Sequence, residues 1–447
     1  MICARAFAGK HYAVYGLARC GLATVEALLA SGARVTAWDD KLFSGEGRSP
    51  GQGSGLRRRT EIADLNTADL SQFDSLVVTP GLPLNRHPIA ARARTAGLEI
   101  IGDIELFARA RRELPPHKVV GITGTNGKST TTALVHHILH TAGVPSLMGG
   151  NIGLPILAQD PLPEGGVYVL ELSSYQLDLT QSLDCDVAVL LNITPDHLDR
   201  YESFEAYAAS KARLFEMQSA EKVAVGAIDD QHSREVVTSL TGQLDLITIA
   251  SGQTSDIRLN DGLDEFTGQA RWTALQGPHN LQNALAAATA CWALGDVSLT
   301  DLKRGLETFP GLPHRMERVR EKDGILFVND SKATNATATA PALAAFPAIR
   351  WILGGQAKAD NLDECAPYFS HVRSAYTIGE AGGLFASLLR PHLAVAECNT
   401  LDAAVKAAAH DAQPGETVLL SPACASFDQF ADFEARGDAF RICVGAL

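Results

Sequence analysis

Short apolar runs alternate with helical patterns along the first third of the chain. Strands are predicted at Tyr12–Gly16, Ala33–Trp38, Ser75–Thr79 and Leu98–Ile101, and helices at Gly21–Ser31 and His87–Ala96. Strands that alternate with helices favour a parallel sheet. The segment Ser44–Thr60 is rich in Gly, Ser and Arg, and we expect it to be a mobile surface loop.

The same alternation starts again after two proline-rich breaks, at Leu114–His117 and at Phe309–Pro313. Strands are predicted after the first break at Val119–Ile122, Val167–Leu172, Val187–Leu191 and Lys222–Ala227, and after the second at Ile325–Val328, Trp351–Gly354, Ala375–Ile378 and Val418–Leu420. An Ala-rich helix is predicted at Leu281–Leu294. The pattern indicates an α/β protein of three domains, covering residues 1–112, 113–310 and 311–447.

Composition supports this organisation and excludes several classes of protein. The 447 residues are 46% hydrophobic and 20% charged, which suits several packed cores and rules out a disordered chain or a small disulfide scaffold. The net charge of −13 argues against general nucleic-acid binding. The eight cysteines form no C-x-x-C pair, which favours free thiols. We found no membrane-length apolar run or signal peptide, and therefore expect a cytoplasmic protein without a membrane partner.

The strongest local motif follows the strand predicted at Val119–Ile122. Its residues are Thr123-Gly-Thr-Asn-Gly-Lys-Ser129, and a helix is predicted to follow from Thr130 to Thr141. Glycines let a backbone wrap closely around a phosphate, and a helix N-terminus attracts its charge. Lys128 would neutralise a phosphoryl group and Ser129 could bind Mg²⁺. The strict phosphate-loop pattern would need glycine where Ile122 stands, so a coincidental glycine turn is the alternative.

This loop resembles the ATP loop of the Mur ligases and of the folylpolyglutamate synthetases. Further segments that resemble Mur ligases are Gly149–Gly153, Glu171–Gln176, Asn192–Arg200, Gly311–Arg315, Asn329–Asn335, Leu420–Phe430 and Phe433–Gly437. Together the matches run from about residue 12 to residue 440. The resemblance is strongest to the Mur ligases that add D-glutamate, and it implies a Rossmann-like first domain, a central P-loop-type ATPase domain and a Rossmann-like third domain.

The resemblance also implies a reaction, which belongs to the synthesis of peptidoglycan precursors. ATP activates the L-alanyl carboxylate of UDP-N-acetylmuramoyl-L-alanine as an acyl phosphate, and the amine of D-glutamate then displaces phosphate. ATP and Mg²⁺ are the expected cofactors, and a monomer is the expected state. A carboxylate is a poor acylating agent at neutral pH, so the protein would mainly position anions and stabilise developing charge.

Six residues carry the catalytic and metal roles that the resemblance implies: Lys128, Ser129, Glu171, His197, Lys211 and Lys332. Lys128 acts at the transferred phosphoryl group, Glu171 and His197 are Mg²⁺ ligands beside Ser129, and Lys211 is carbamylated so that it can also bind the metal. His197 would in addition contact the substrate. Without the resemblance, Glu171 reads as a solvated acid at a strand end, Lys211 as a solvated helix lysine, and His197 as a structural histidine.

The remaining ATP contacts come from the loop and from the later motifs. By resemblance they are Gly124, Thr125, Asn126, Gly127, Lys128, Ser129, Thr130, Asn280, Asn283, Arg315 and Asp330. Helix capping is the alternative for the two asparagines, because Asn favours helix starts. Lys332 and Thr334 match residues near the acyl phosphate and the incoming amino acid, with surface salt bridges as the alternative for Arg315 and Lys332.

The predicted pockets for the two other substrates lie at opposite ends of the chain. By resemblance, D-glutamate would contact Lys358, Ser426 and Phe427, since a lysine and a hydroxyl suit a dicarboxylic amino acid. The UDP precursor would contact Arg19, Cys20, Asp39, Asp40, Thr79 and Asn151. Asn151 could instead stabilise its turn. We discount a Cys424 nucleophile because no suitable His or Asn arrangement lies near it in the sequence.

Other functions compete with a D-glutamate ligase. A folylpolyglutamate synthetase would lack a first domain of this kind, whereas a Mur ligase for L-alanine, a diamino acid or a dipeptide is a nearer alternative. Gly16-Leu-Ala-Arg-Cys-Gly21 is similar to a dinucleotide fingerprint and suggests an NAD(P)-dependent oxidoreductase, but Ala18 replaces its middle glycine. A nonenzymatic ATP-binding regulator is a further class.

Overall fold

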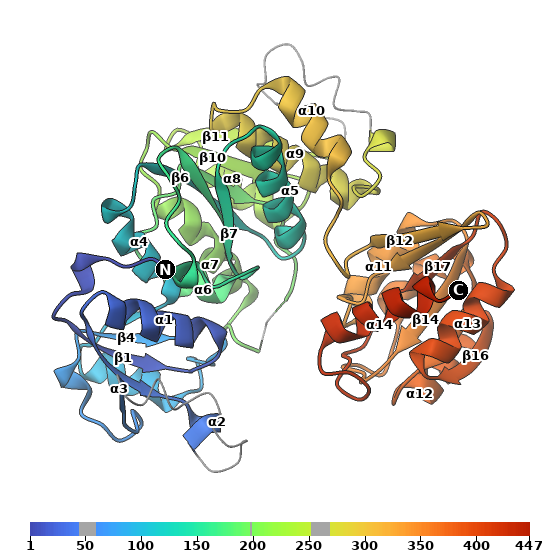
Figure 1. The fold of residues 1–447 in the computed structure, drawn as a ribbon, viewed down its shortest axis with the longest axis horizontal. Coiled ribbons are helices and arrows are strands. Elements are labelled where there is room, and N and C mark those ends of the chain that lie inside the picture. Colours follow the sequence, from blue (N-terminus) through green and yellow to red (C-terminus); the bar gives the residue numbers. More distant parts are fainter. Residues whose placement is uncertain (44–59, 197–198, 252–268) are drawn as a thin grey trace. The chain divides into compact units, whose positions relative to one another are not determined.

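The computed structural model describes residues 1–43, 60–196, 199–251 and 269–447, and it builds them into three β-sheets flanked by helices (Figure 1). The helices are α1 (Arg19–Ala30), α2 (Asp40–Phe43), α3 (Pro88–Thr95), α4 (Asp103–Ala110), α5 (Lys128–Thr141), α6 (Ser174–Asp178), α7 (Phe204–Glu216), α8 (Gln231–Ser239), α9 (Pro278–Ala293), α10 (Leu299–Thr308), α11 (Ala336–Ala345), α12 (Gly382–Leu389), α13 (Leu401–Asp411) and α14 (Phe433–Gly445). Short 3₁₀ helices lie at Arg5–Phe7, Leu70–Gln72, Arg111–Glu113, Ile156–Ala158, Gln269–Arg271 and Asp363–His371.

The first sheet is parallel throughout and has the strand order β3-β2-β1-β4-β5. Its strands are β1 (His11–Tyr15), β2 (Arg34–Trp38), β3 (Glu61–Ile62), β4 (Ser75–Val78) and β5 (Ile100–Ile101). The strand order reverses direction between β1 and β4. In open parallel sheets, ligands bind at such a point, beyond the carboxyl ends of the strands. The turn after β1 and the segment after β4 therefore face a candidate ligand site.

The second sheet is also parallel and has the order β11-β10-β9-β6-β8-β7. Its strands are β6 (His117–Thr123), β7 (Ser146–Gly150), β8 (Gly166–Glu171), β9 (Val187–Leu190), β10 (Val223–Ala227) and β11 (Asp245–Ile249). The central strand β6 is followed directly by the glycine-rich loop and α5. This places the loop at the carboxyl ends of β8 and β9, the two neighbours of β6.

The third sheet has the order β12-β13-β17-β14-β15-β16, and only the pairing of β12 with β13 is antiparallel. Its strands are β12 (Glu317–Lys322), β13 (Ile325–Asn329), β14 (Ile349–Gly354), β15 (Val372–Ile378), β16 (Ala394–Asn399) and β17 (Thr417–Leu420). β13, β17 and β14 are neighbours, so the loops that follow them meet at one edge of the sheet.

The chain divides into two compact units. The first comprises Met1–Thr267 with Gln282–Leu306, and it contains the first two sheets; the second comprises Gly268–Leu281 with Glu307–Leu447, and it contains the third. One apolar core of the first unit joins its two sheets across α1, α4 and the 3₁₀ helix at Ile156–Ala158, and a second core packs β1 and β4 against α3. The second unit has cores of its own on the two faces of its sheet.

The α/β class and the parallel sheets that the sequence predicts are confirmed. Every inner strand of the three sheets coincides with a predicted strand. The edge strands β3, β7, β11, β12 and β16 were not predicted. The expected mobile loop at Ser44–Thr60 lies outside the described residues except for Thr60, and the three domain boundaries remain predictions. Among the described residues, no helix has the length and apolarity needed to cross a bilayer.

Candidate active site

The loop between β6 and α5 is shaped for the close approach of another group. Gly124 and Gly127 have φ angles of +152° and +86°, which L side chains rarely adopt. A Cβ at Gly127 would lie 2.2 Å from Oδ1 of Asn283. α5 begins at Lys128 with Gly127 at the N-cap, so the positive end of the helix dipole points into the loop. Such a terminus suits a phosphate.

Asn192, which follows β9, holds the loop in this shape. Its main-chain carbonyl accepts from the amide of Thr125 at 2.8 Å, and its Oδ1 accepts from the amide of Asn126 at 2.8 Å. The Thr125 hydroxyl lies 3.0 Å from that of Tyr207 and donates to the carbonyl of Thr194 at 3.1 Å. Neither Asn192 nor Tyr207 was singled out from the sequence, although both lie in or near quoted motifs.

Two lysines converge on one carbonyl of the loop. Lys128 Nζ donates to the Gly124 oxygen at 2.8 Å, and Lys211 Nζ donates to the same oxygen at 2.9 Å. Lys211 is only 1% exposed and lies 4.6 Å from the centre of the Tyr207 ring. Burial, and after it the charge of Lys128, hold the pKa of Lys211 well below its usual value. The interpretation of Lys211 as a solvated helix lysine is therefore wrong.

Glu171 ends β8 and is also buried, at 2% exposure, so it is not a solvated strand-end acid. Its Oε1 accepts from Nδ2 of Asn151 at 3.1 Å, and its main-chain carbonyl accepts from the Asn151 amide at 2.9 Å. Its Oε2 is buried without a hydrogen-bond partner among the described residues. A carboxylate oxygen left in this way fits Mg²⁺, which takes one or two protein carboxylates and completes its shell with water and phosphate oxygens.

Two further metal ligands, Ser129 and His197, were predicted from the sequence. Ser129 lies in the first turn of α5, as does Thr130. His197 lies outside the described residues, so its predicted roles stay predictions. Within the described part of the chain, no three His, Cys, Asp or Glu side chains gather into a metal cluster.

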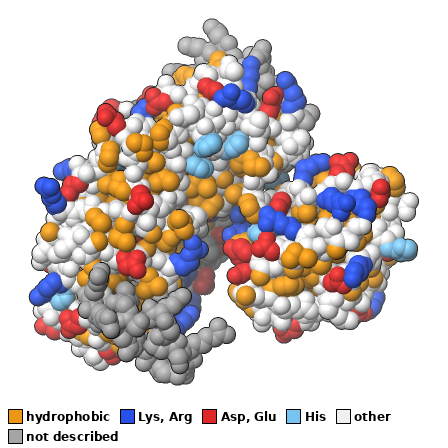
Figure 2. All heavy atoms as spheres, in the orientation of Figure 1, with side chains coloured by type: hydrophobic (Ala, Val, Ile, Leu, Met, Phe, Trp, Pro, Cys, Tyr) orange, Lys and Arg blue, Asp and Glu red, His pale blue; other side chains and the backbone are white. Residues whose placement is uncertain are grey.

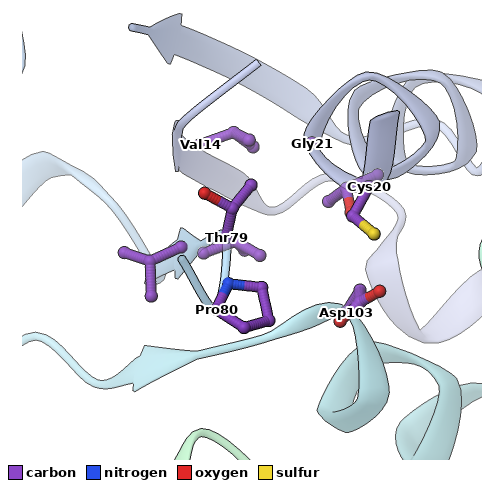
Figure 3. Close-up of a pocket in the computed structure, with 9 residues that line it drawn as sticks. Val14, Cys20, Gly21, Thr79, Pro80 and Asp103 are labelled. Atoms are coloured by element: carbon purple, nitrogen blue, oxygen red, sulfur yellow. The ribbon is translucent and has the colours of Figure 1, made fainter. Parts of the chain in front are cut away.

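In the first sheet, the turn after β1 packs directly against the segment after β4. A Cβ at Gly16 would lie 2.3 Å from Oγ1 of Thr79. Cys20, Thr79 and Asp103 line a small cavity of about 10 Å³, roughly the room that one water needs. Figure 3 shows these side chains at the turn after β1 and the segment after β4. Burial raises the pKa of Cys20 to about 12, so it carries a thiol rather than a thiolate. Asp103 was not predicted from the sequence.

The two predicted uridine-pocket carboxylates also build this region. Asp39 accepts from the main-chain amide of Leu17 at 2.7 Å and so fixes the turn after β1. Asp40 accepts from the Tyr15 hydroxyl and from Nε1 of Trp38, both at 2.7 Å. Burial alone would raise the pKa of Asp40, but these and further hydrogen bonds outweigh it and lower the pKa.

Two arginines link the first sheet to the second. Arg19 donates to the carbonyl of Gly153 at 3.5 Å, in the turn that also contains the predicted substrate residue Asn151. Arg200 donates to the carbonyl of Leu82 at 2.8 Å and stacks 4.3 Å from the ring centre of Tyr175. The structure therefore brings the predicted precursor residues Arg19 and Asn151 to neighbouring turns.

The two predicted adenine contacts lie inside α9 rather than at its cap. The helix begins at Pro278, so Asn280 and Asn283 stand after its first residue and the capping alternative is wrong. Both are buried. Asn280 Nδ2 donates to the Gln276 carbonyl at 3.0 Å, and Asn283 Oδ1 accepts from the Thr131 hydroxyl at 3.3 Å.

In the second unit, predicted residues gather in the loop after β13. Asp330 accepts from the Ser421 hydroxyl at 2.8 Å and from the Met316 amide at 3.1 Å, and burial raises its pKa to about 7. Lys332 Nζ lies 4.2 Å from the ring centre of Phe433.

Arg315, a predicted ATP contact, acts on a histidine of α9. Burial, and after it the charge of Arg315, lower the pKa of His279.

The predicted amino-acid pocket draws on the same loop and two others. Lys358 Nζ donates to the Thr334 hydroxyl at 3.2 Å. Ser426 is buried, whereas Phe427 is 69% exposed. Burial raises the pKa of Cys424 to about 12, which further disfavours a nucleophilic role for this thiol.

Comparison with known proteins agrees with these features. Residues 122–291 match the family described as the Mur ligase middle domain, and residues 314–424 match the Mur ligase, glutamate ligase domain. The chain is 60% identical to the UDP-N-acetylmuramoylalanine--D-glutamate ligase of Novosphingobium aromaticivorans, over 100% of this chain and 97% of that one. It is 58% identical to the enzyme of that name from Sphingopyxis alaskensis, over the full length of both.

The chain belongs to the Mur ligase family. Solved structures of Mur ligases share its fold at low sequence identity. MurF of Thermotoga maritima in complex with ADP matches with a TM-score of 0.59 at 17% identity, covering 98% of this chain and 96% of that one. MurC of the same organism matches with a TM-score of 0.58 at 16% identity, covering 98% and 99%. The Mur ligase fold therefore extends over nearly the whole chain.

Proposed function

We propose that this Mur ligase joins D-glutamate to UDP-N-acetylmuramoyl-L-alanine at the expense of ATP, in the synthesis of peptidoglycan precursors. The observation that carries the proposal is the 54–60% identity, over the whole chain, to relatives that bear the name of this D-glutamate ligase. The loop after β6, with two lysines on one of its carbonyls, suits the phosphates of a nucleotide.

The proposed reaction proceeds in two steps. A carboxylate oxygen of the L-alanyl group attacks the γ-phosphorus of ATP, and the bond from that phosphorus to the β,γ-bridging oxygen breaks to release ADP. The amine of D-glutamate then attacks the acyl carbon of the resulting acyl phosphate. Inorganic phosphate leaves from the tetrahedral intermediate, and the amine loses a proton.

The chain's own residues would mainly hold and neutralise anions in this reaction. Lys128 would swing from its loop carbonyls to the γ-phosphoryl group, which gains charge in the transition state. Glu171 and Ser129 would hold Mg²⁺, which supplies Lewis-acid stabilisation of the phosphoryl oxygens when bound. Burial lowers the pKa of Lys211 and so favours the neutral amine, which is the form that could take up CO₂. The resulting carbamate would be a further anionic ligand.

The remaining predicted residues divide between the other substrates. Arg19, Cys20, Thr79 and Asn151, with Asp39 and Asp40 behind them, would form the site for the UDP precursor. Thr334, Lys358, Ser426 and Phe427 would bind D-glutamate, and Lys332 would act catalytically near the acyl phosphate. Asn280, Asn283, Arg315 and Asp330 would contact ATP. Each of these assignments rests on the resemblance of the surrounding motif to the Mur ligases.

The decisive experiment measures phosphate release with ATP, UDP-N-acetylmuramoyl-L-alanine and a panel of D- and L-amino acids. We expect turnover only when the precursor and D-glutamate are both present, together with a product heavier than the precursor by one glutamyl residue. Preference for L-alanine, a diamino acid or a dipeptide would identify a different Mur ligase. ATP turnover that is equal without any amino acid would contradict the proposal.

A further inference from the structure

The motif Phe433–Gly437 has no task in the reaction proposed above, although it opens α14. The first residue of the motif, Phe433, lies under the ammonium group of Lys332 at 4.2 Å. Arg436 follows one helical turn later and is only 1% exposed. A buried arginine is uncommon and costly, so its partners indicate what it does.

Arg436 binds two loops at once. Its Nε donates to the Ser331 hydroxyl at 3.0 Å, and its Nη2 donates to the Ser331 carbonyl at 2.8 Å. Nη2 also donates to the carbonyl of Cys424 at 3.0 Å, and Nη1 donates to that of Ala425 at 3.3 Å. Ser331 lies in the loop after β13, whereas Cys424 and Ala425 lie in the loop after β17.

A third loop closes around the same guanidinium. The loop after β14 begins at Gly355, where a Cβ would lie 3.2 Å from Nη1 of Arg436 and 2.3 Å from the Ala425 carbonyl. The next residue, Gln356, exchanges two main-chain hydrogen bonds of 2.9 Å with Ala425. The guanidinium therefore lies where the loops of three neighbouring strands meet, and only a glycine fits at the closest approach.

The chemistry of these contacts suits a tie between loops rather than an ion pair. All four acceptors of Arg436 are neutral oxygens. Burial lowers its pKa to about 10, so the group still carries its charge at neutral pH. The planar fork of arginine can reach acceptors on several sides, which a lysine ammonium cannot do in one position.

We propose that Arg436 is a positioning residue for the amino-acid site of this ligase. The loops that it ties carry Lys332 and Thr334 after β13, Lys358 after β14, and Ser426 after β17. Its hydrogen bonds hold these loops in register, so that their cations and hydroxyls converge on an acidic amino acid. This inference rests on the proposed function, because D-glutamate is the ligand for which the loops are set.

The test compares Arg436→Lys and Arg436→Met with a matched control, Arg350→Met. Arg350 pairs with Glu416 at 2.8 Å near the opposite ends of β14 and β17, so its loss weakens the same sheet away from the three loops. Steady-state KM values for D-glutamate and for the UDP precursor are measured for each variant, together with Tm.

We expect Arg436→Lys to raise KM for D-glutamate about tenfold and Arg436→Met to raise it further, since hydrogen bonds to a charged group are lost. KM for the precursor should stay within about twofold in both, given that its predicted site lies on another sheet. The control should lower Tm and leave both KM values unchanged. Ser331→Ala, a milder change that removes one acceptor, should raise KM for D-glutamate by a few-fold.

A lower Tm with an unchanged KM for D-glutamate would make Arg436 merely structural and would overturn the inference. So would equal rises in both KM values. If Arg436→Met does not fold, Arg436→Lys and Ser331→Ala provide the test instead, through the rise in KM for D-glutamate relative to the rise in KM for the precursor. A wild-type enzyme that needs no D-glutamate would instead refute the proposed function, and that result is obtained before any variant is made.

Discussion

At the scale of single residues, the unusual groups are ionisable side chains that are almost fully buried. Lys211, Asp103, Glu105 and Arg436 are all at most 4% exposed. The sequence could not reveal their burial, because a charged residue in a helical pattern is normally on the surface. The signals that were available were the quoted motifs around Arg436 and the apolar neighbours of Asp103 and Glu105 in α4.

The buried amine of Lys211 leads to a first prediction. Lys211→Ala should reduce ligase activity by about 100-fold or more, and millimolar formate or acetate should restore part of it if a carbamate normally stands there. Because the pKa of Lys211 is lowered, a larger fraction of its amine is neutral near pH 7 than in an ordinary lysine. The neutral amine is the form that reacts with CO₂.

The matched control for this prediction is Lys222→Ala, which removes a half-buried lysine paired with Asp186, each of them directly before a strand of the second sheet. Its activity should be insensitive to added carboxylates. Equal stimulation of both variants, or no rescue of Lys211→Ala by any small carboxylate, would count against the carbamate.

Asp103 leads to a second prediction, on stability against pH. Burial raises its pKa to about 6, so between about pH 4 and pH 6 the folded state keeps a proton that the unfolded state has lost. The unfolded state then binds fewer protons, and this residue's contribution to stability falls as pH rises through that window, by about 3 kcal/mol.

Asp103→Asn should remove the pH-dependent contribution of this residue to the free energy of unfolding, since an amide does not titrate. Chemical unfolding at several pH values between about 4 and 7 checks this, and the variant should gain stability relative to the wild type as pH rises. A constant difference between the two proteins across the window would show that Asp103 titrates normally.

At the scale of elements, every inner strand could be predicted, whereas β5 was the one edge strand of the described sheets that was predicted. Inner strands such as β1 and β9 are buried on both faces and read as apolar runs. Edge strands such as β12 and β16 contain no buried residue, and polar side chains stand among their apolar ones without a strict alternation. Burial imposes no sequence pattern on such strands, because their only requirement is to pair with one neighbour.

The loop between β6 and α5 provides an element-scale prediction. Gly127→Ala would strain a positive φ and push a Cβ to within 2.2 Å of Asn283, in the tightest part of the loop. We expect KM for ATP to rise by about tenfold or more, because the amides that face the phosphates must shift. Steady-state kinetics at saturating precursor and D-glutamate would measure it.

Gly143→Ala is the matched control at the other end of α5. Gly143 has a similar φ of +78°, but a Cβ there meets nothing within 4 Å. This variant should lose about 1 kcal/mol of stability from backbone strain and keep its KM for ATP. If the two variants behave alike, the close contact with Asn283 plays no part in nucleotide binding.

At the scale of the whole molecule, charge and binding follow different rules. The proposed substrates are all anionic, whereas the chain has a net charge of −13. The face seen in Figure 2 mixes acidic and basic side chains over both units. Binding would therefore depend on local groups such as Lys128 and on main-chain amides, because salt screens distant exposed charges beyond about 8 Å.

The distribution of the apolar cores predicts how the molecule unfolds. A core joins the first two sheets, whereas the cores of the third sheet contain residues of the second unit alone. We expect calorimetry to resolve two transitions. Leu106→Ala, in the shared core, should lower one of them by several degrees, and Leu419→Ala, in the third sheet, should lower the other. A single transition that both substitutions shift equally would contradict this division.

The shared core of the first two sheets also limits how such a chain can be inherited in parts. Leu106 and Phe107 of α4 are buried in that core, and the carboxylate of Glu105 accepts from the amides of Gln181 and Ser182 beside the second sheet. A gene fusion or exchange that cut the chain between these sheets would expose the apolar face of one fragment to water. In the other fragment, the amides of Gln181 and Ser182 would lose Glu105 as their hydrogen-bond acceptor. Recombination should therefore transfer the first unit, Met1–Thr267 with Gln282–Leu306, as one block, whereas the third sheet, with cores of its own, is the part that can be exchanged.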